Sequence, residues 1–571
     1  MFITGRVFQG LENGTPVFSK AWKFFGAFSQ GSENSAGVFP GPGWRRAQHR
    51  NFPAGFSKAG KNHPFHFPIL GKIFLLAALT AVAGARELPL TILYTTDLHG
   101  HLAGVTSRKE PRGTGGLLRC ATLIEQVRAQ EKNVLLLDAG DTLQGSAESW
   151  LTGGRCLTRA MELLRYDAWC LGNHDFDWGT AALTNLLAKS KLDVLAANIA
   201  PPLPGVQSWL LKETRGVRVA LIGLTNPFIP KWTRPELLGD YRFDRPVETL
   251  ARLLPAVRAE KPDVIALLIH EGYRPAGDDG ANEIRALAKR FPELDVILGG
   301  HQHEALLAPT GLGVLYLEAG CHGQAVGRVD LLVDIDRHKV VRRSASLLIA
   351  SNGVPESAEL RRHFIRDLSR AEKHLAEPVG AAAAAIAATG PVRGQSPLQQ
   401  LLCAAIAEKV QAEIVLHGTL AEAGLAAGPL TMRDIWRIVP YENRIGVAYL
   451  TLQEIRAILE ENANVPGDHF LGVWGLAYDL RTAAAPGQRV HNLRLADGTK
   501  AHGKKRYAVA FNSHTLASGG GRFPTLPQLI AEPRARFALT TNDTRAAVAA
   551  YVRQHSPLYP AHPSLVKISS E

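Results

Sequence analysis

From residue 88 onward, short apolar runs rich in Val, Ile and Leu alternate with amphipathic segments, and few folds accommodate that pattern. One intervening segment, LLRCATLIEQVRAQEK at 117–132, has the spacing of a helix with a single apolar face. The runs lie at 90–96, 133–140, 167–172, 193–199, 217–225, 263–270 and 295–300, and further runs follow at 313–320 and 325–336. Because strands covered by helices on both sides need apolar side chains on both faces, this pattern predicts an α/β fold.

The chain has 571 residues, which is enough for several domains. Residues 355–377 are charged, begin at Pro355 and have a helical pattern, so we expect a connecting helix there. Further strand-like runs follow at 412–416, 445–451 and 506–512. We therefore expect a first domain over 88–345, a linker over 346–377 and a second, smaller α+β domain over 378–571.

The N-terminal region differs in composition from the rest of the chain. Residues 1–67 hold eleven of the 21 Phe and no Asp, and they show no sustained periodicity. In 68–85, Lys72 precedes the run IFLLAALTAVAGA, and Ala83-Gly84-Ala85 resembles a cleavage site. This pattern is typical of a secretory signal peptide, with a buried helix or membrane anchor as the alternative. We expect an exported, periplasmic or extracellular protein without a stable membrane span after cleavage, and an extension over 1–67 that is disordered or a start-site artefact.

The positive charge of the chain is concentrated in the same region. Residues 1–85 contain nine Lys or Arg and two Glu, a net charge of +7, which leaves +5 of the chain's +12 for the remainder. That remainder shows no basic stripe interleaved with aromatic residues, so we expect no nucleic-acid partner. Five Cys form no close-spaced pair, and a disulfide framework is not indicated.

Carboxylate, imidazole and amide side chains follow five of the apolar runs. They are Asp97, His99, Asp141, Asn173, His174, His270, His301 and His303. In α/β sheets ligands bind outside the carboxyl ends of the strands, so these side chains can converge on one place. Asp97 and His99 lie two residues apart, as do His301 and His303, and on an extended backbone each pair would point to one side.

Mixed carboxylate, imidazole and amide ligands suit Mn, Zn or Fe, and this number of ligands suits two ions with one bridging carboxylate. Any one of these histidines taken singly is better interpreted as a surface residue or a hydrogen-bonded core residue than as a metal ligand. Asp141 taken alone could be a turn residue after Gly140. Taken together, five strand ends with matching groups predict a dinuclear metal site.

The motifs D-x-H, G-D, G-N-H-D, an isolated His after a strand, and G-H-x-H resemble those of the calcineurin-like metallophosphoesterases. The longer stretches TDLHGHL, GDTLQGS, GNHDFDWG and AANI resemble the 5′-nucleotidase family within that group. The resemblance covers about 88–540 and is most specific in the first half. It implies a four-layer metallophosphoesterase domain, with two sheets flanked by helices, followed by a linker helix and a C-terminal nucleotide-recognition domain.

The resemblance also implies roles for individual residues. Metal one would take Asp97, His99, Asp141 and His303, and metal two would take Asp141, Asn173, His270 and His301. His174 would face the phosphoryl group, and Asp177 would hold its imidazole. Asp175 stands where the family commonly has Glu, and we expect no catalytic role for it. The implied reaction is hydrolysis of a small phosphate ester, such as a nucleotide, by a metal-bound hydroxide.

The second half departs from the family pattern. Substrate-binding positions implied by the resemblance are Arg393, Tyr441, Gly475 and His514, with Thr515 as an alternative to His514. Glu422 lies nearest the position of an expected Arg, and Gly521 replaces an expected Asp. A carboxylate in place of a guanidinium weakens an anion site, so altered specificity is expected. The alternatives are a non-nucleotide ester, including thiosulfohydrolase-type chemistry, and a non-catalytic metal-stabilised binding protein.

Overall fold

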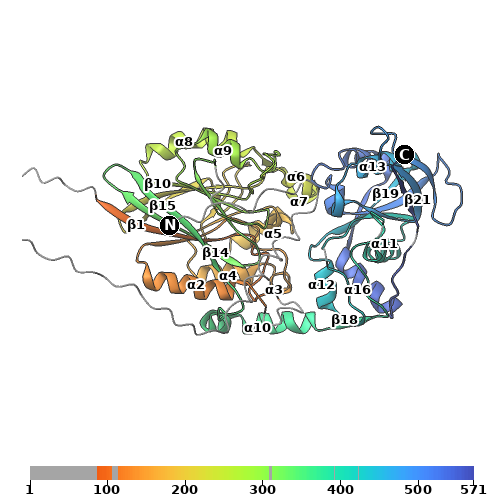
Figure 1. Cartoon of the computed structure of the whole chain (residues 1–571), viewed down its shortest axis with the longest axis horizontal. Coiled ribbons are helices and arrows are strands. Elements are labelled where there is room, and N and C mark those ends of the chain that lie inside the picture. Colours follow the sequence, from red (N-terminus) through yellow and green to blue (C-terminus); the bar gives the residue numbers. More distant parts are fainter. Residues whose placement is uncertain are drawn as a thin grey trace, which may run out of the picture. The chain divides into compact units, whose positions relative to one another are not determined.

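The computed structural model describes residues 86–105, 113–307, 311–390, 392–421, 423–562 and 564–570, and residues 87–571 form one compact unit (Figure 1). The expected extension over 1–67, the expected signal peptide over 68–85 and Glu422 lie outside the described residues. The expected strands and helices from residue 88 onward can all be compared with the structure.

The first half of this unit contains a seven-stranded sheet in the order β15-β14-β1-β2-β3-β4-β6. Its members are β1 (Glu87–Thr95), β2 (Val134–Asp138), β3 (Ala168–Cys170), β4 (Val194–Leu195), β6 (Val206–Gln207), β14 (Ala325–Asp334) and β15 (Lys339–Ile349). Strands β1 to β6 of this sheet run parallel, and β14 and β15 add an antiparallel edge. Because β15 ends at Ile349, this sheet extends a few residues past the expected boundary at 345.

A second, six-stranded sheet has the order β12-β13-β11-β10-β8-β7. Its members are β7 (Trp209–Thr214), β8 (Val217–Leu224), β10 (Val264–Ile269), β11 (Val296–Gly299), β12 (Ala305–Leu307) and β13 (Leu315–Ala319). Its four central strands are parallel, and antiparallel strands flank them on both edges.

The two sheets pack face to face with helices on their outer surfaces, which is the expected four-layer α/β arrangement. In β1, the side chains of Leu90, Ile92 and Tyr94 join the core between the sheets, whereas Leu93 joins the core under the helices. This alternation follows from the period of two along a strand. Helices α2 (Leu117–Gln130), α4 (Arg155–Leu163) and α5 (Thr180–Leu187) cover the first sheet, and α8 (Pro246–Ala259) and α9 (Ile284–Arg290) cover the second (Figure 1). Each fully buried aliphatic side chain contributes about 2 kcal/mol.

Helix α10 (Ala358–Leu375) lies within the expected connecting segment. The side chain of Ser357 caps its start by accepting from the backbone N–H of Leu360. Leu360, Phe364 and Leu368, four residues apart, pack on the core of the first half, and Ala371 packs on a core of the second half. The helix is thus bound to both halves by one apolar stripe.

The second half is built around a five-stranded sheet in the order β20-β17-β23-β19-β24. Its members are β17 (Ile414–His417), β19 (Arg444–Thr451), β20 (Gly472–Trp474), β23 (Arg506–Asn512) and β24 (Ala538–Asp543). Two smaller sheets combine β16 (Pro378–Ala382) with β18 (Gly428–Thr431), and β21 (Leu476–Arg481) with β22 (Val490–Leu495) and β25 (Val566–Ser569). The helices are α11 (Pro397–Val410), α12 (Met432–Ile438), α13 (Leu452–Asn462), α14 (Ser513–Leu516), α15 (Thr525–Ala531) and α16 (Thr544–His555). This is the expected α+β class.

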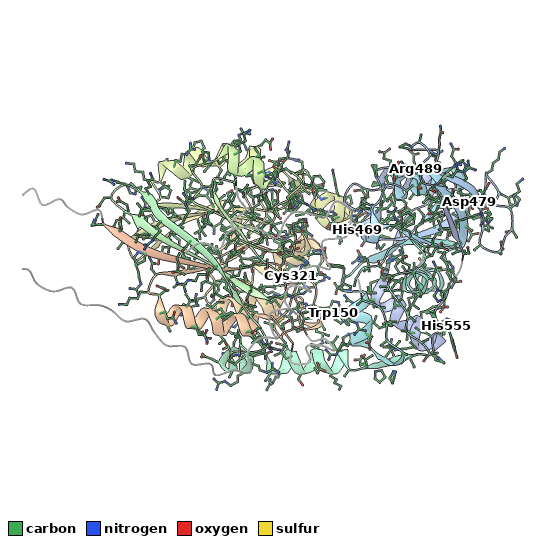
Figure 2. The ribbon with its side chains drawn as sticks, in the orientation of Figure 1. Trp150, Cys321, His469, Asp479, Arg489 and His555 are labelled. Carbon is green, nitrogen blue, oxygen red and sulfur yellow. The ribbon has the colours of Figure 1, made fainter. Side chains whose placement is uncertain are left out.

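All five cysteines are free, and only Cys321 is partly exposed (Figure 2). Within the described residues, no helix combines the length and the apolar character that a membrane crossing requires.

Candidate metal centre and catalytic pair

Five strand ends from the two sheets meet in one place. Strands β1, β2 and β3 of the first sheet precede Asp97 and His99, Asp141, and Asn173 and His174, respectively. Strands β10 and β11 of the second sheet precede His270, and His301 and His303. The structure gathers these side chains into two groups that could each hold a metal ion. One group is Asp97, His99 and His303, and the other is Asp141, His270 and His301.

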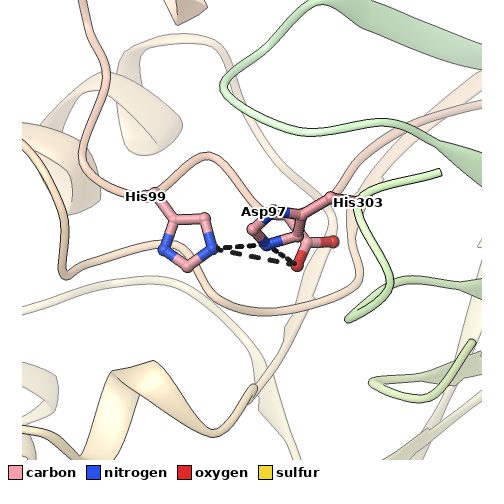
Figure 3. Close-up of side chains that lie close together, drawn as sticks. All are labelled: Asp97, His99 and His303. Atoms are coloured by element: carbon pink, nitrogen blue, oxygen red, sulfur yellow. Dashed lines mark hydrogen bonds and ion pairs between the residues drawn. The ribbon is translucent and has the colours of Figure 1, made fainter. Parts of the chain in front are cut away.

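The first group is compact (Figure 3). The Nε2 atoms of His99 and His303 lie 3.0 Å apart, and Asp97 Oδ1 lies 3.9 Å from the former and 3.4 Å from the latter. Asp97 and His99 are almost fully buried. The His303 side chain is 20% exposed. Two imidazole nitrogens and a carboxylate that point at one another in this largely buried place form a set of donors that a cation would satisfy.

The carboxylate of the second group, Asp141, also lies close to the first group. Asp141 Oδ2 lies 3.0 Å from Nε2 of His270 and 3.8 Å from Nε2 of His99, so it stands between the groups. Oδ1 of Asn173 is buried and has no hydrogen-bond partner, and buried Nε2 of His270 has the ion-pair contact with Asp141 but no hydrogen bond of good geometry. Buried polar atoms are rarely left without a partner, so these atoms indicate a ligand.

Hydrogen bonds to carbonyl oxygens set the tautomers of two imidazoles. Nδ1 of His99 lies 2.9 Å from the carbonyl oxygen of Gln144, and Nδ1 of His270 lies 2.8 Å from that of Ala139. A carbonyl only accepts, so each Nδ1 carries a proton, and in the neutral ring each Nε2 has a lone pair that a metal can take. Burial lowers the pKa of His270, but the carboxylates of Asp141 and Asp97 outweigh it and raise the pKa to about 10. The buried carboxylates therefore favour positive charge in the site, and two divalent cations fit the residues present.

The backbone that presents these ligands is not extended, so the expected reason for their pairing is wrong. The φ angles are 50° for Asp97, 47° for His99, 54° for Asp141, 74° for His301 and 58° for His303. This left-handed region is uncommon for residues other than glycine and costs of order 1–3 kcal/mol each. The ligands are thus brought together by strained turns after the strands, a conformation that the sequence pattern did not indicate.

His174 and Asp177 form a pair beside the metal residues. Nδ1 of His174 lies 2.8 Å from Oδ2 of Asp177, and the backbone N–H of His174 donates to Oδ1 of Asp141 over 2.7 Å. Burial lowers the pKa of His174, but the carboxylates of Asp177 and Asp141 raise it to about 9. The pair lies on the short 3-10 turn η1 (His174–Phe176) and at the residue that follows it.

Asp175 has a structural function that sequence analysis missed. Its buried carboxylate accepts four backbone N–H groups, from Asp141, Thr142, Leu143 and Gly172, over 2.8–3.2 Å. These bonds join the loop after β2 to the loop after β3, and therefore hold Asp141 and Asn173 in register. The available signal was the acidic residue that ends GNHD, for which the sequence analysis expects no catalytic role.

Replacing Asp175 by alanine is expected to lower the free energy of unfolding by about 3 kcal/mol, because four buried N–H groups lose their acceptor. Urea denaturation of both proteins would measure the difference. Asp193→Ala, which changes a carboxylate whose side chain is 45% exposed, serves as the control. Equal stability of Asp175→Ala and the unchanged protein would contradict this interpretation.

The predicted substrate-binding residues occupy different surroundings. The ring of Tyr441 stacks on the imidazole of His174, with centroids 4.9 Å apart and planes 14° apart. His514 lies on α14, where burial and then the charges of Arg522 and His174 lower its pKa to about 3.

The other two lie elsewhere in the second half. The Arg393 guanidinium lies 4.5 Å from the ring centre of Phe470, and its Nε and Nη2 atoms are buried without partners. Gly475 has φ 74°, and a Cβ there would lie 1.9 Å from the carbonyl oxygen of Glu413, so the backbone itself requires glycine. The substrate roles of all four residues stay predictions.

Comparisons with known proteins agree with this architecture. The family model described as calcineurin-like phosphoesterase matches residues 90–305, and the model described as 5′-nucleotidase, C-terminal domain, matches residues 378–528. The chain is 25% identical over 519 residues to the 5′-nucleotidase of Vibrio cholerae, covering 79% of this chain and 91% of that protein.

Endonuclease YhcR of Bacillus subtilis is 25% identical to this chain over 485 residues. The matched region covers 79% of this chain but only 39% of the length of that protein. The crystal structure of a 5′-nucleotidase precursor from Thermus thermophilus has the same fold, with a TM-score of 0.69 and 23% identity over 85% of this chain and 100% of that one. The calcineurin-like phosphoesterase match precedes the 5′-nucleotidase C-terminal match along the chain, and it contains both groups of candidate ligands. The chain therefore belongs to the 5′-nucleotidase family of calcineurin-like metallophosphoesterases, which are metal-dependent hydrolases of phosphoric esters.

Proposed function

We propose that this protein is an exported dinuclear hydrolase of nucleotides or related phosphate esters. The observation that supports this most directly is the convergence of two candidate metal-ligand groups, with Asp141 close to both, next to the His174–Asp177 pair. A module that only binds a metal has no use for such a pair, whereas hydrolysis needs a charged donor beside the phosphoryl group.

In this proposal Asp97, His99, Asp141 and His303 hold one ion, and Asp141, Asn173, His270 and His301 hold the other. When bound, the two divalent ions would supply Lewis-acid activation of water and of the phosphoryl oxygens.

His174 would donate through Nε2 to the phosphoryl group or to the leaving oxygen. Asp177 accepts from Nδ1 of His174, which fixes the orientation of the ring and favours its charged form. The backbone N–H of His174 bonded to Asp141 ties the pair to the metal ligands, so donor and cations keep one geometry.

A non-nucleotide ester is the second candidate, including one cleaved by thiosulfohydrolase-type chemistry. It is favoured by the surroundings of Tyr441, one face of which is covered by His174 and is not free to stack on a base. His514 and Thr515 point the same way, because an imidazole or a threonine side chain is a weaker stacking platform for a base than a Phe or Tyr ring.

Phosphate release by the purified protein with Mn added tests both candidates. The panel holds AMP, a UDP-sugar, a 2′,3′-cyclic nucleotide and an aryl phosphate. Release from AMP or the UDP-sugar supports the nucleotide proposal, and release from the aryl phosphate alone supports the second candidate. Two bound metals without any turnover would overturn both in favour of a binding protein.

Removal of divalent cations is expected to abolish phosphate release and to lower the thermal midpoint, because the buried carboxylates of Asp97 and Asp141 lose their counter-charge. Treatment with EDTA, followed by an activity assay and a thermal scan, measures both effects. EDTA saturated with Ca²⁺ is the control, and added Mn should restore activity. Full turnover by protein in which elemental analysis finds no transition metal would refute the proposed metal requirement.

Export is proposed from the pattern of residues 68–85, which lie before the start of β1 at Glu87. N-terminal sequencing of the native protein would test it. A mature chain that begins near Arg86 supports export, and one that retains residues 1–67 contradicts it.

A further inference from the structure

The backbone segment of residues 439–442 lies between the two halves of the compact unit and bears the ring that covers the catalytic histidine. The first half contacts the segment at three points. Nε2 of Gln144 donates to the carbonyl oxygen of Pro440 over 3.3 Å, Nε1 of Trp178 donates to the carboxylate of Glu442, and the imidazole of His174 stacks on Tyr441. Gln144 and Trp178 lie on the loops after β2 and β3 that also carry Asp141 and His174.

The same segment is held from the other side by a single arginine. Arg545, in the first turn of α16, donates from Nε to the carbonyl oxygen of Val439 over 3.0 Å and from Nη2 to that of Pro440 over 2.8 Å. Its Nη1 lies 3.5 Å from a carboxylate oxygen of Glu442. The guanidinium also lies 3.4 Å from the ring centre of Trp436, on the helix that leads into the segment.

The two shortest hydrogen bonds of Arg545 hold main-chain carbonyl groups. The Arg545 side chain is only about 6% exposed, so its position is set by packing and the guanidinium is shielded from water. A planar guanidinium binds two consecutive carbonyl oxygens with one rigid group, which a flexible ammonium cannot reproduce. Because Tyr441 follows Pro440 directly, the direction of its ring depends on the carbonyl groups that Arg545 holds.

We propose that Arg545 is a positioning residue that holds the 439–442 segment so that Tyr441 covers one face of the His174 imidazole. Its effect on turnover rests on the proposed function of His174, but its effect on the placement of Tyr441 does not. The cover limits the ring positions open to His174 and excludes water from one side of the His174–Asp177 pair, which preserves the geometry of a donor.

Hydroxyl-radical footprinting of the full chain tests the placement without any turnover. Arg545→Met should raise the rate of Tyr441 oxidation by about threefold or more, because the half-buried ring loses its fixed place. Arg553→Met is the matched control, since Arg553 lies on the same helix and reaches only the sulfur of Met432, 3.9 Å away. Unchanged oxidation of Tyr441 in a folded Arg545→Met protein would overturn the proposal.

Kinetics on the best substrate of the panel test the effect on His174. Arg545→Met is expected to lower kcat about tenfold with little change in KM, because the loss concerns the geometry of the donor. In a Tyr441→Ala background the same change should cost less than about twofold, since Arg545 acts through Tyr441. Equal losses in both backgrounds would mean a general structural role and would overturn the proposal.

If Arg545→Met does not fold, Arg545→Lys provides the same test with the charge retained. Lysine offers a point charge instead of two fixed donors, so it should give an intermediate rise in Tyr441 oxidation. Oxidation equal to that of the unchanged protein would again overturn the proposal. If the unchanged protein hydrolyses no ester, the proposed function fails. The footprinting result then still shows whether Arg545 keeps the Tyr441 ring in place.

Discussion

Replacing His174 by alanine is expected to lower kcat for phosphate release by about 1000-fold while the metal content of the protein stays the same. None of the proposed metal ligands is lost in this variant, since the backbone N–H of residue 174 still donates to Asp141. What is lost is the cationic donor next to the phosphoryl group. Phosphate release and elemental analysis of the same preparation measure the two quantities.

The chain offers a matched control for this variant. His338 also pairs with a carboxylate, Nδ1 lying 2.5 Å from Oδ1 of Asp263, but it lies after β14, on a turn outside the metal site. His338→Ala removes the same kind of pair and should leave kcat within about twofold. A His174→Ala protein with near-normal kcat would show that the donor is another group.

Replacing Asp141 by asparagine is expected to abolish activity by a different route, through loss of bound metal. Asp141 is the carboxylate that lies near both groups, 3.0 Å from Nε2 of His270 and 3.8 Å from Nε2 of His99. An amide is a neutral and weaker ligand, so both ions should bind less tightly, by about 100-fold or more for the pair. Elemental analysis after dialysis and the loss of phosphate release measure this effect.

Excess Mn should distinguish the two variants. High Mn should restore part of the activity of Asp141→Asn but none of that of His174→Ala, because only the former has a weakened metal site. Asp330→Asn, which changes a carboxylate on β14 bonded to Thr91 and Arg328, is the control for the substitution itself. Full metal content in Asp141→Asn would contradict the proposed bridging role.

The order of strands and helices follows closely from the sequence. The run at 263–270 became β10, and the run at 295–300 became β11, with a histidine one residue after the end of β10 and another two residues after the end of β11. Period-two alternation of apolar side chains and their presence on both faces depend on local composition, which a single sequence displays. Burial in four layers then follows, since both faces of each sheet must be covered.

The division of those strands into two sheets did not follow from the sequence. Strands β1 and β8 have similar apolar runs, yet β1 pairs with β2 and β14, and β8 pairs with β10 and β7. Partner choice depends on contacts between residues far apart in the chain, and an apolar run does not encode its neighbour. The stacking of Tyr441 on His174 is likewise a contact across 267 positions of sequence that no local pattern reveals.

Which chemical groups stand at the strand ends can be predicted from the amino-acid order alone, because their spacing from the apolar runs places them at one edge of each sheet. How these groups are presented depends on contacts across the whole fold. Distant segments must meet to form each of the following arrangements. They are the left-handed turns at Asp97 and His303, the four N–H groups that donate to Asp175, and the hydrogen bond from Arg545 to the carbonyl oxygen of Pro440. Strained or buried arrangements of this kind are stable only when surrounding packing over-determines them, and packing is a property of the whole fold.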